Sequence, residues 1–146
     1  MSTTWRPQQS VRALAIGVIR RGSEILVAAV EDDAGVTRGW RPLGGTIEFG
    51  ERAADALRRE MVEEIGQAIA EPTPLAVLES FYEHHGAAGH EIVFVFEATF
   101  EDADAYRRER FEFAEGEVMC RAEWIDLARF RSGDLNLFPR ELLDRL

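Results

Sequence analysis

The sequence is poor in cysteine and has no long apolar segment. Its single cysteine, Cys120, excludes an intrachain disulfide, which is typical of proteins in a reducing compartment. No apolar run approaches the roughly 18 residues that a membrane-spanning helix needs. The first residues, MSTTWRPQQSVR, also lack the charged, apolar and small-residue regions of a secretory signal. We therefore expect a cytoplasmic protein that has no membrane partner.

Positive charge is scarce as well. The chain has 17 Lys and Arg residues against 27 Asp and Glu residues, which gives a formal net charge of −10. A field of this sign repels nucleic-acid backbones and anionic membranes, so we expect no nucleic-acid partner. It would also repel a small phosphorylated molecule, unless a bound metal ion reversed the sign locally.

Internal repeats, low-complexity tracts and interdomain linkers are absent too, and 146 residues suffice for one domain with a real core. After a loose, flexible polar tail over residues 1–10, the apolar patterns predict strands at residues 11–20, 24–30, 75–82, 90–100 and 118–125, with an extended segment at 40–45. They predict a central helix at residues 51–65 and shorter helices at 126–131 and 139–146. We expect loops at residues 31–39, 83–89 and 101–117, the last with one helical turn. Strands on both sides of a central helix indicate an α/β sandwich with a mixed sheet.

The expected central helix carries three carboxylates at nearby positions, Glu60, Glu63 and Glu64. Like charges three or four residues apart on a helix repel one another. At about 100° per residue, Glu64 also falls inside the apolar stripe of the helix, where a carboxylate without a partner is costly. Oxygen-rich carboxylate sites suit divalent cations. The alternative, an exposed salt-bridged helix, is the usual setting of a lone helical glutamate but does not account for the fixed spacing around this cluster.

That spacing runs through residues 45–67, GTIEFGERAADALRREMVEEIGQ. It resembles the Nudix box, Gly-x5-Glu-x7-Arg-Glu-U-x-Glu-Glu-x-Gly-U, in which U is a bulky apolar residue. The matching positions are Gly45, Glu51, Arg59, Glu60, Met61, Glu63, Glu64 and Gly66, and the one departure is Gln67 at the final apolar position. Residues 40–100 and the C-terminal tail also look like a bacterial Nudix subgroup with an R-P-L-G-G-x-I-E-F-G-E core.

The resemblance implies a single Nudix domain over residues 1–146, with the α/β/α sandwich of that family. It also implies Mg²⁺- or Mn²⁺-dependent hydrolysis of a diphosphate linkage in a small nucleoside diphosphate derivative, by a metal-activated water. A nucleotide sugar or ADP-ribose, a dinucleoside polyphosphate and a nucleoside triphosphate all fit. The family pattern makes Glu60, Glu63 and Arg59 catalytic residues. It assigns metal binding to Glu60, Glu63, Glu64, Gly45 and Glu51, and Glu97 is a further candidate.

The residues that recognise the substrate are less constrained by the motif. Gly44, Tyr82, His90 and Glu115 are candidates for substrate binding. The general base can come from the box or from outside it, where Glu97, Glu112, Glu115 and Glu117 are available. A second hypothesis is a non-catalytic module that senses a nucleotide metabolite on the same fold. Since many members of the family form dimers, a homodimer is a further expectation.

Overall fold

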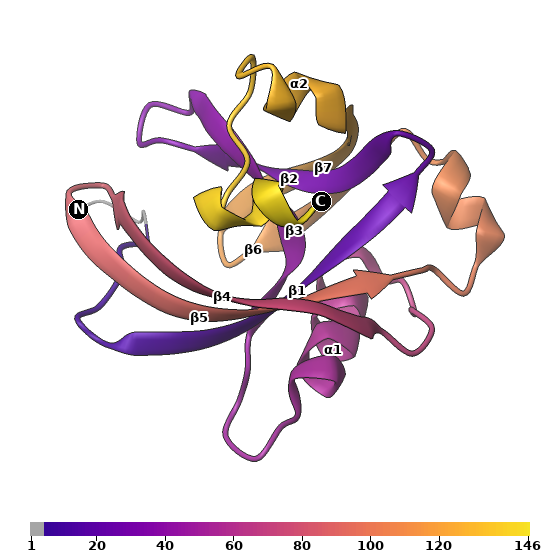
Figure 1. Ribbon diagram of the computed structural model, residues 1–146, viewed down its shortest axis with the longest axis horizontal. Helices are drawn as coiled ribbons and strands as arrows, with labels where there is room; N and C mark the ends of the chain where they lie inside the picture. Colours follow the sequence, from indigo (N-terminus) through magenta and orange to yellow (C-terminus); the bar gives the residue numbers. More distant parts are fainter. Residues whose placement is uncertain (1–4) are drawn as a thin grey trace.

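The computed structural model describes residues 5–146, and one seven-stranded mixed sheet forms its centre (Figure 1). The strands are β1 (Val11–Arg21), β2 (Glu24–Glu31), β3 (Thr37–Thr46), β4 (Thr73–His84), β5 (Ala87–Ala98), β6 (Arg110–Glu115) and β7 (Val118–Asp126). The α-helices are α1 (Ala53–Ile65) and α2 (Leu127–Arg131), and two 3₁₀ helices are η1 (Ala103–Arg107) and η2 (Arg140–Arg145). The strand order is β4-β5-β1-β3-β2-β7-β6.

Strand β1 joins the two halves of the sheet. It runs parallel to β5 from Val11 to Ile19, antiparallel to β3 at its middle, and antiparallel to β2 at its last two residues. Every other strand pairing among residues 5–146 is antiparallel, so the predicted mixed sheet is confirmed.

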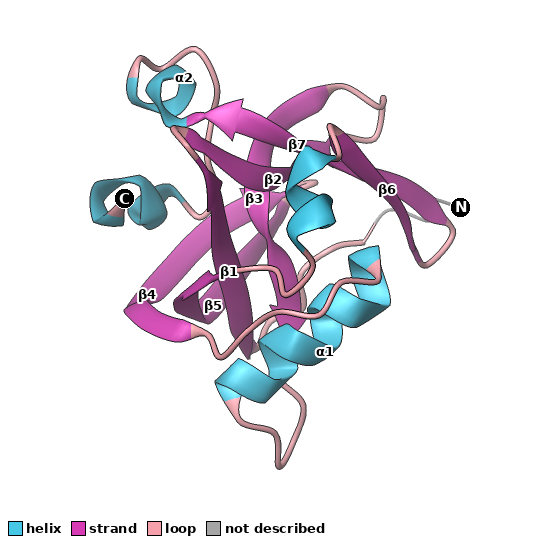
Figure 2. Cartoon of the chain, turned by 90° about the vertical axis from the view of Figure 1, so that its right-hand side faces the viewer, coloured by secondary structure: helices cyan, strands magenta, loops and turns pink. Residues whose placement is uncertain are grey.

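Apolar side chains fill both faces of the sheet. Helix α1 covers one face, where its buried Leu57 and Met61 pack with residues of β1, β3 and β6. The close approach depends on Gly17 of β1, because a Cβ there would lie 3.1 Å from both helix side chains. The opposite core contains Phe130 of α2 and Leu142 of η2. Figure 2 shows α1 apart from α2 and the C-terminal segment, with strands between them. This arrangement confirms the expected α/β sandwich.

The central helix begins later than the sequence pattern suggested. It starts at Ala53, with Arg52 in an extended conformation as its N-cap, so Glu51 lies in the preceding loop and not in the first turn. It ends at Ile65, and Gly66 adopts the left-handed conformation (φ 67°) that favours glycine after a helix. Among residues 5–146, no helix combines the length and apolarity needed to cross a membrane.

All three predicted loops were wrong in extent. The loop predicted at residues 31–39 is shorter, because β2 includes Glu31 and β3 begins at Thr37. Residues 101–117 contain strand β6, in which Phe111 and Phe113 are buried while the intervening Glu112 is exposed. This period-two pattern is strong, but the surrounding charges hid it. Residues 83–89 form a tight hairpin in which only His85 and Gly86 lie outside β4 and β5.

The two ends of the chain also differ in part from expectation. The predicted closing helix is the 3₁₀ helix η2 and not an α-helix. Residues 1–4 of the predicted tail lie outside the described part of the chain. Residues 5–7 have no regular structure, yet Trp5 packs against the guanidinium of Arg12, which lies 4.7 Å from the ring centroid.

Candidate active site

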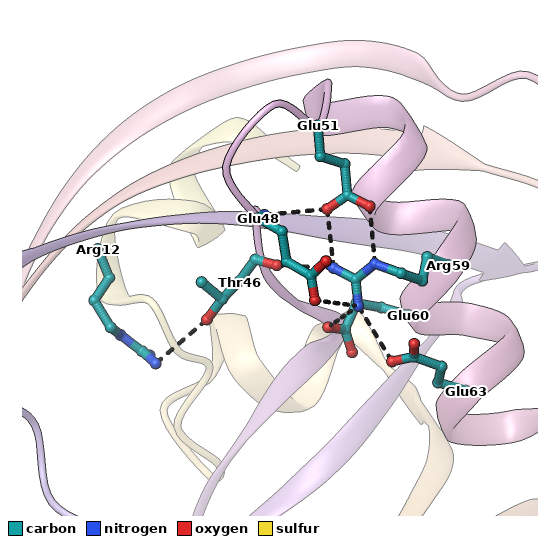
Figure 3. A network of polar contacts seen from close by, with 7 residues as sticks. All are labelled: Arg12, Thr46, Glu48, Glu51, Arg59, Glu60 and Glu63. Atoms are coloured by element: carbon teal, nitrogen blue, oxygen red, sulfur yellow. Dashed lines mark hydrogen bonds and ion pairs between the residues drawn. The ribbon is translucent and has the colours of Figure 1, made fainter.

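Arg59, on the second turn of α1, is the centre of an ion-pair network (Figure 3). Its Nε and Nη2 donate to the two carboxylate oxygens of Glu51 at 2.8 and 2.9 Å. Its Nη1 donates to Glu60 at 3.0 Å and to Glu63 at 3.2 Å, and its Nη2 also donates to the carbonyl oxygen of Thr46 at 3.0 Å. One guanidinium therefore ties the helix to the loop between β3 and α1.

Glu51 is held as a carboxylate by this arrangement. Besides the two bonds from Arg59, it accepts the backbone N–H of Glu48 at 3.1 Å. The hydrogen bonds from Arg59 and Glu48 lower the pKa of the Glu51 carboxyl to about 2, because they stabilise its charged form. Glu51 is therefore fully ionised at neutral pH and fixes the loop against the helix.

The two glycines at the end of β3 have different structural roles. Gly45 faces α1, and a Cβ there would lie 2.5 Å from the carboxylate carbon of Glu60. Only a glycine lets that carboxylate rest against the strand. Gly44 has φ 149°, and a Cβ there would collide with the carbonyl oxygen of Ala15 on β1. Gly44 is therefore required for the close approach of β1 and β3, because any side chain at this position would point into the backbone of β1.

Glu64 differs from the other glutamates of α1, because Arg59 does not reach it. Its Oε2 is buried and has no hydrogen-bond partner among the described residues. Burial raises the pKa of Glu64 to about 8; Arg41 opposes this effect, and the neighbouring carboxylates Glu115 and Glu60 add to it. The position that breaks the apolar pattern of the helix therefore carries one buried carboxyl oxygen without a partner among the described residues, which is costly unless a ligand completes it.

Arg41 and Glu115 form a second polar group beside Glu64. Arg41 lies on β3 and Glu115 at the end of β6, and Nη2 of Arg41 contacts Oε2 of Glu115 at 3.3 Å. The thiol of Cys120 on β7 is 3.7 Å from the same carboxylate oxygen. Burial, followed by the charge of Glu115, raises the pKa of this thiol to about 11, so Cys120 is a neutral neighbour.

Sequence reasoning missed Arg41. It precedes Leu43 and Gly45 by two and four residues, and both of these face α1. Since side chains alternate along a strand, Arg41 had to point toward the same helix. The signal was therefore present in the alternation of β3.

The donor set suits a hard divalent cation, although the side chains are not gathered around one point. Among residues 5–146, no three His, Cys, Asp or Glu side chains are clustered as metal ligands would be. Arg59 holds one oxygen of Glu60 and one of Glu63, and each carboxylate has a second oxygen outside these ion pairs. Together with the unpartnered oxygen of Glu64 and the cradle at Gly45, they fit an oxygen-liganded ion such as Mg²⁺ or Mn²⁺.

The structure does not bring Glu97 to this cluster. Glu97 lies on the same face of β5 as Val93 and Val95, which pack in the core on the side of the sheet opposite to α1. It forms an ion pair with Arg20 at 3.1 Å. Of the other acids considered as a general base, Glu112 points away from α1 and pairs with Arg110 at 3.2 Å, whereas Glu115 shares the α1 side of β6 with Phe111 and Phe113. The acid at residue 117 lies in the hairpin turn.

Tyr82 and His90 lie at the far end of β4 and β5, where they border a pocket of about 380 Å³ together with residues 8–11. His90 stacks on the exposed ring of Phe81 at 4.3 Å, and its buried Nε2 has no partner among the described residues. Tyr82 donates to Glu91 at 2.9 Å, and burial followed by the charge of Glu91 raises the pKa of the tyrosine to about 12. Neither residue contacts the box glutamates directly.

A chain of polar contacts connects this pocket with the glutamate network. Arg12 donates to Glu91, the partner of Tyr82, through Nε at 3.2 Å. The same guanidinium lies 3.4 Å from the hydroxyl of Thr46, whose carbonyl oxygen accepts from Arg59 (Figure 3). The pocket is thus linked to the carboxylates of α1 through Thr46, the last residue of β3.

Comparison with known proteins agrees with the fold and the motif. A family model described as NUDIX domain matches residues 10–146. The nucleoside triphosphatase NudI of Escherichia coli O17:K52:H18 is 31% identical over 128 residues, which cover 85% of this chain and 84% of that protein. A MutT NUDIX hydrolase from Burkholderia pseudomallei superposes with a TM-score of 0.62 at 24% identity, covering 82% of this chain and 86% of that one. A NUDIX hydrolase from Nitrosomonas europaea gives a TM-score of 0.66 at 17% identity, covering 93% and 86%.

Proposed function

The chain belongs to the NUDIX family and is a pyrophosphohydrolase, and from this premise we propose that it cleaves a diphosphate linkage of a nucleotide in a reaction that requires Mg²⁺ or Mn²⁺. The observation that carries the proposal is the buried Glu64 oxygen without a partner, beside Glu60 and Glu63 on the same helix. A chain that needed these acids only for solubility would not bury one of them unpaired.

The proposed metal ligands are Glu60, Glu63 and Glu64, with support from Gly45 and Glu51. A bound divalent ion would offset the charge of the substrate and lower the pKa of a coordinated water. Gly45 leaves room for the Glu60 carboxylate, and Glu51 acts through Arg59. Because Arg59 holds Glu51, Glu60 and Glu63 at once, it keeps the carboxylates at defined positions before the substrate arrives.

Proton removal from the attacking water is proposed for a glutamate of the box. Glu63 is the best placed to exchange protons with solvent, since its side chain is 58% exposed, whereas that of Glu60 is 17% exposed. Among the acids considered outside the box, Glu115 is the one on the α1 side of the sheet, where it contacts Arg41.

We propose a nucleoside triphosphate as the substrate, because the E. coli relatives at 30–31% identity are named nucleoside triphosphatases. The pocket beside Tyr82 and His90 is proposed to receive the base. The ring of Phe81 is 65% exposed there and offers a stacking face, and the unpaired Nε2 of His90 offers a polar contact. Gly44 shapes this end of the site only through the β1–β3 pairing.

A substrate panel tests the proposal. Purified protein is incubated with nucleoside triphosphates, nucleotide sugars, ADP-ribose and dinucleoside polyphosphates, each with Mg²⁺, with Mn²⁺ and with EDTA. We expect release of pyrophosphate or phosphate from triphosphates only with metal, and a large loss of rate in Glu64→Gln. The matched control is Glu97→Gln, which alters a glutamate on the opposite face. Tight nucleotide binding without turnover by the wild type would instead support a sensing module, and metal-independent turnover would overturn the proposed role of the acids.

A further inference from the structure

Arg41 places positive charge beside the most buried acid of the helix. It points to the α1 side of β3, and it is the cation that opposes the burial effect on the Glu64 carboxyl. The other cation at this helix, Arg59, is occupied by Glu51, Glu60, Glu63 and a carbonyl oxygen. All N–H groups of Arg59 are therefore engaged in hydrogen bonds, and Arg41 is the arginine that could bind a phosphate entering the site.

The recorded contacts of Arg41 leave most of its hydrogen-bonding capacity unused. A guanidinium has five N–H donors, and one of them, on Nη2, meets Glu115 at 3.3 Å. No other hydrogen bond of Arg41 is recorded among residues 5–146, and its side chain is 31% exposed. A single contact at that distance is weak compared with the paired bonds that arginine makes with a phosphate group.

Glu115 is positioned so that its carboxylate can move away from Arg41. It is the last residue of β6, its side chain is 59% exposed, and the following Gly116 has φ 63° in the hairpin turn. Its carboxylate is close enough to Glu64 for the two charges to repel each other. An exposed ion pair of this kind contributes little to stability.

We propose that Arg41 binds a phosphate group of the substrate and that Glu115 occupies this place in the free protein, so that substrate binding exchanges a carboxylate for a phosphate on Arg41. The proposal rests on the proposed function in that it assumes a polyphosphate ligand at the glutamates of α1. It adds a specificity: the site selects ligands with a second phosphate group that reaches from the glutamates to β3.

Binding of imidodiphosphate, a diphosphate analogue with a non-hydrolysable bridge, tests the exchange without turnover. Its Kd is measured by titration calorimetry with Mg²⁺ for the wild type, Arg41→Gln, Glu115→Gln and the double variant. We expect Arg41→Gln to weaken binding about 10-fold or more, which equals about 1.4 kcal/mol. Glu115→Gln should tighten binding severalfold because the competing carboxylate is gone. The double variant should bind like Arg41→Gln, because Glu115 competes only through Arg41.

The control is Arg58→Gln, since Arg58 pairs with Asp55 and Glu71 and takes no part in the site. Unchanged binding in Arg41→Gln would overturn the proposal, and so would weaker binding in Glu115→Gln, which would make Glu115 a direct ligand. If Arg41→Gln unfolds, Arg41→Lys keeps the charge without the paired donors and should show an intermediate loss, and Glu115→Gln still decides independently.

The two proposals fail in different ways. If the wild type hydrolyses nucleotides and Glu64→Gln does not, but Arg41→Gln keeps the wild-type KM and Kd, only the exchange on Arg41 is wrong. If the wild type binds imidodiphosphate through Arg41 but hydrolyses no member of the substrate panel, the proposed function fails and the phosphate contact stands.

Discussion

Replacing Glu64 by Gln removes one charge from the interior and keeps the shape of the side chain. Without a bound metal ion this charge lowers the stability of the folded protein, because the buried Oε2 has no hydrogen-bond partner among residues 5–146. Burial raises the pKa of Glu64 to about 8, against an ordinary 4.5. Between these two pH values the folded protein holds a proton that the unfolded chain has released, so stability falls as the pH rises.

The size of the effect follows from the two pKa values. A single group of this kind changes the free energy of unfolding by about 1.4 kcal/mol per pH unit between its unfolded and folded pKa. For Glu64 the accumulated cost above pH 8 is on the order of 5 kcal/mol, a large part of the roughly 5 to 15 kcal/mol that stabilises a domain. Glutamine carries no charge at any of these pH values, so Glu64→Gln should not show this loss.

The assay is urea unfolding in EDTA at a series of pH values from about 4 to 8.5, which span the two pKa values of Glu64. We expect the stability of Glu64→Gln relative to the wild type to grow with pH and to level off near pH 8. The exposed Glu109 gives the control, and Glu109→Gln should follow the wild type throughout. Adding Mg²⁺ at pH 8 should stabilise the wild type by mass action and leave Glu64→Gln nearly unchanged.

A constant difference between Glu64→Gln and the wild type across this pH range would refute the reasoning, because it would mean that Glu64 titrates as it does in the unfolded chain. An equal Mg²⁺ stabilisation of both proteins would refute the assignment of Glu64 as a metal ligand. The two outcomes are independent, since the first concerns burial and the second concerns the ligand.

Three further substitutions test the rest of the site. Gly45→Ala would force its Cβ against the carboxylate of Glu60, so it should lower the Mg²⁺-dependent rise in melting temperature and reduce turnover at least about tenfold, whereas unchanged metal affinity would contradict the role of the glycine. Arg59→Lys cannot hold its partners at once and should cost about 1 to 3 kcal/mol in urea unfolding, with turnover reduced; full activity would show that Arg59 does not position the acids. Glu97→Gln should leave Mg²⁺ affinity as it is, because Glu97 pairs with Arg20 on the other face, and a clear loss in a calorimetric titration would restore it as a ligand.

The sequence was sufficient to predict the parts whose pattern is local. The strands β1, β2 and β7 and the end of α1 at Gly66 follow from apolar periodicity and from the stop signal of a single glycine. The position of Glu64 at the apolar stripe also predicted a partly buried carboxyl group, and the structure shows a half-buried side chain whose Oε2 is buried.

What the sequence could not supply was long-range. The pairing of Arg59 with Glu51 depends on how the loop before α1 turns back, and the contact of Arg41 with Glu115 depends on which strands flank the helix. Charged positions obscured β6, because a strand in which every second residue is charged looks like a polar loop until its partner β7 is known.

The chain is acidic and its expected substrate is anionic. The two are compatible because the two arginines of the site differ in the number of carboxylates that they bind within residues 5–146: Arg59 binds several and Arg41 binds one. Arg59 forms ion pairs with three carboxylates and thereby fixes their positions. Its single positive charge cannot neutralise all three, so the group keeps a net negative charge. Burial, with smaller contributions from the charges of Glu115 and Glu60, raises the pKa of Glu64 to about 8, so this carboxyl group keeps a proton that a divalent ion must displace. Metal binding should therefore release a proton near neutral pH. The phosphate would then meet a site in which the metal ion has reversed the local charge, and Arg41, which among the described residues is held only by its ion pair with Glu115, would be available to bind it.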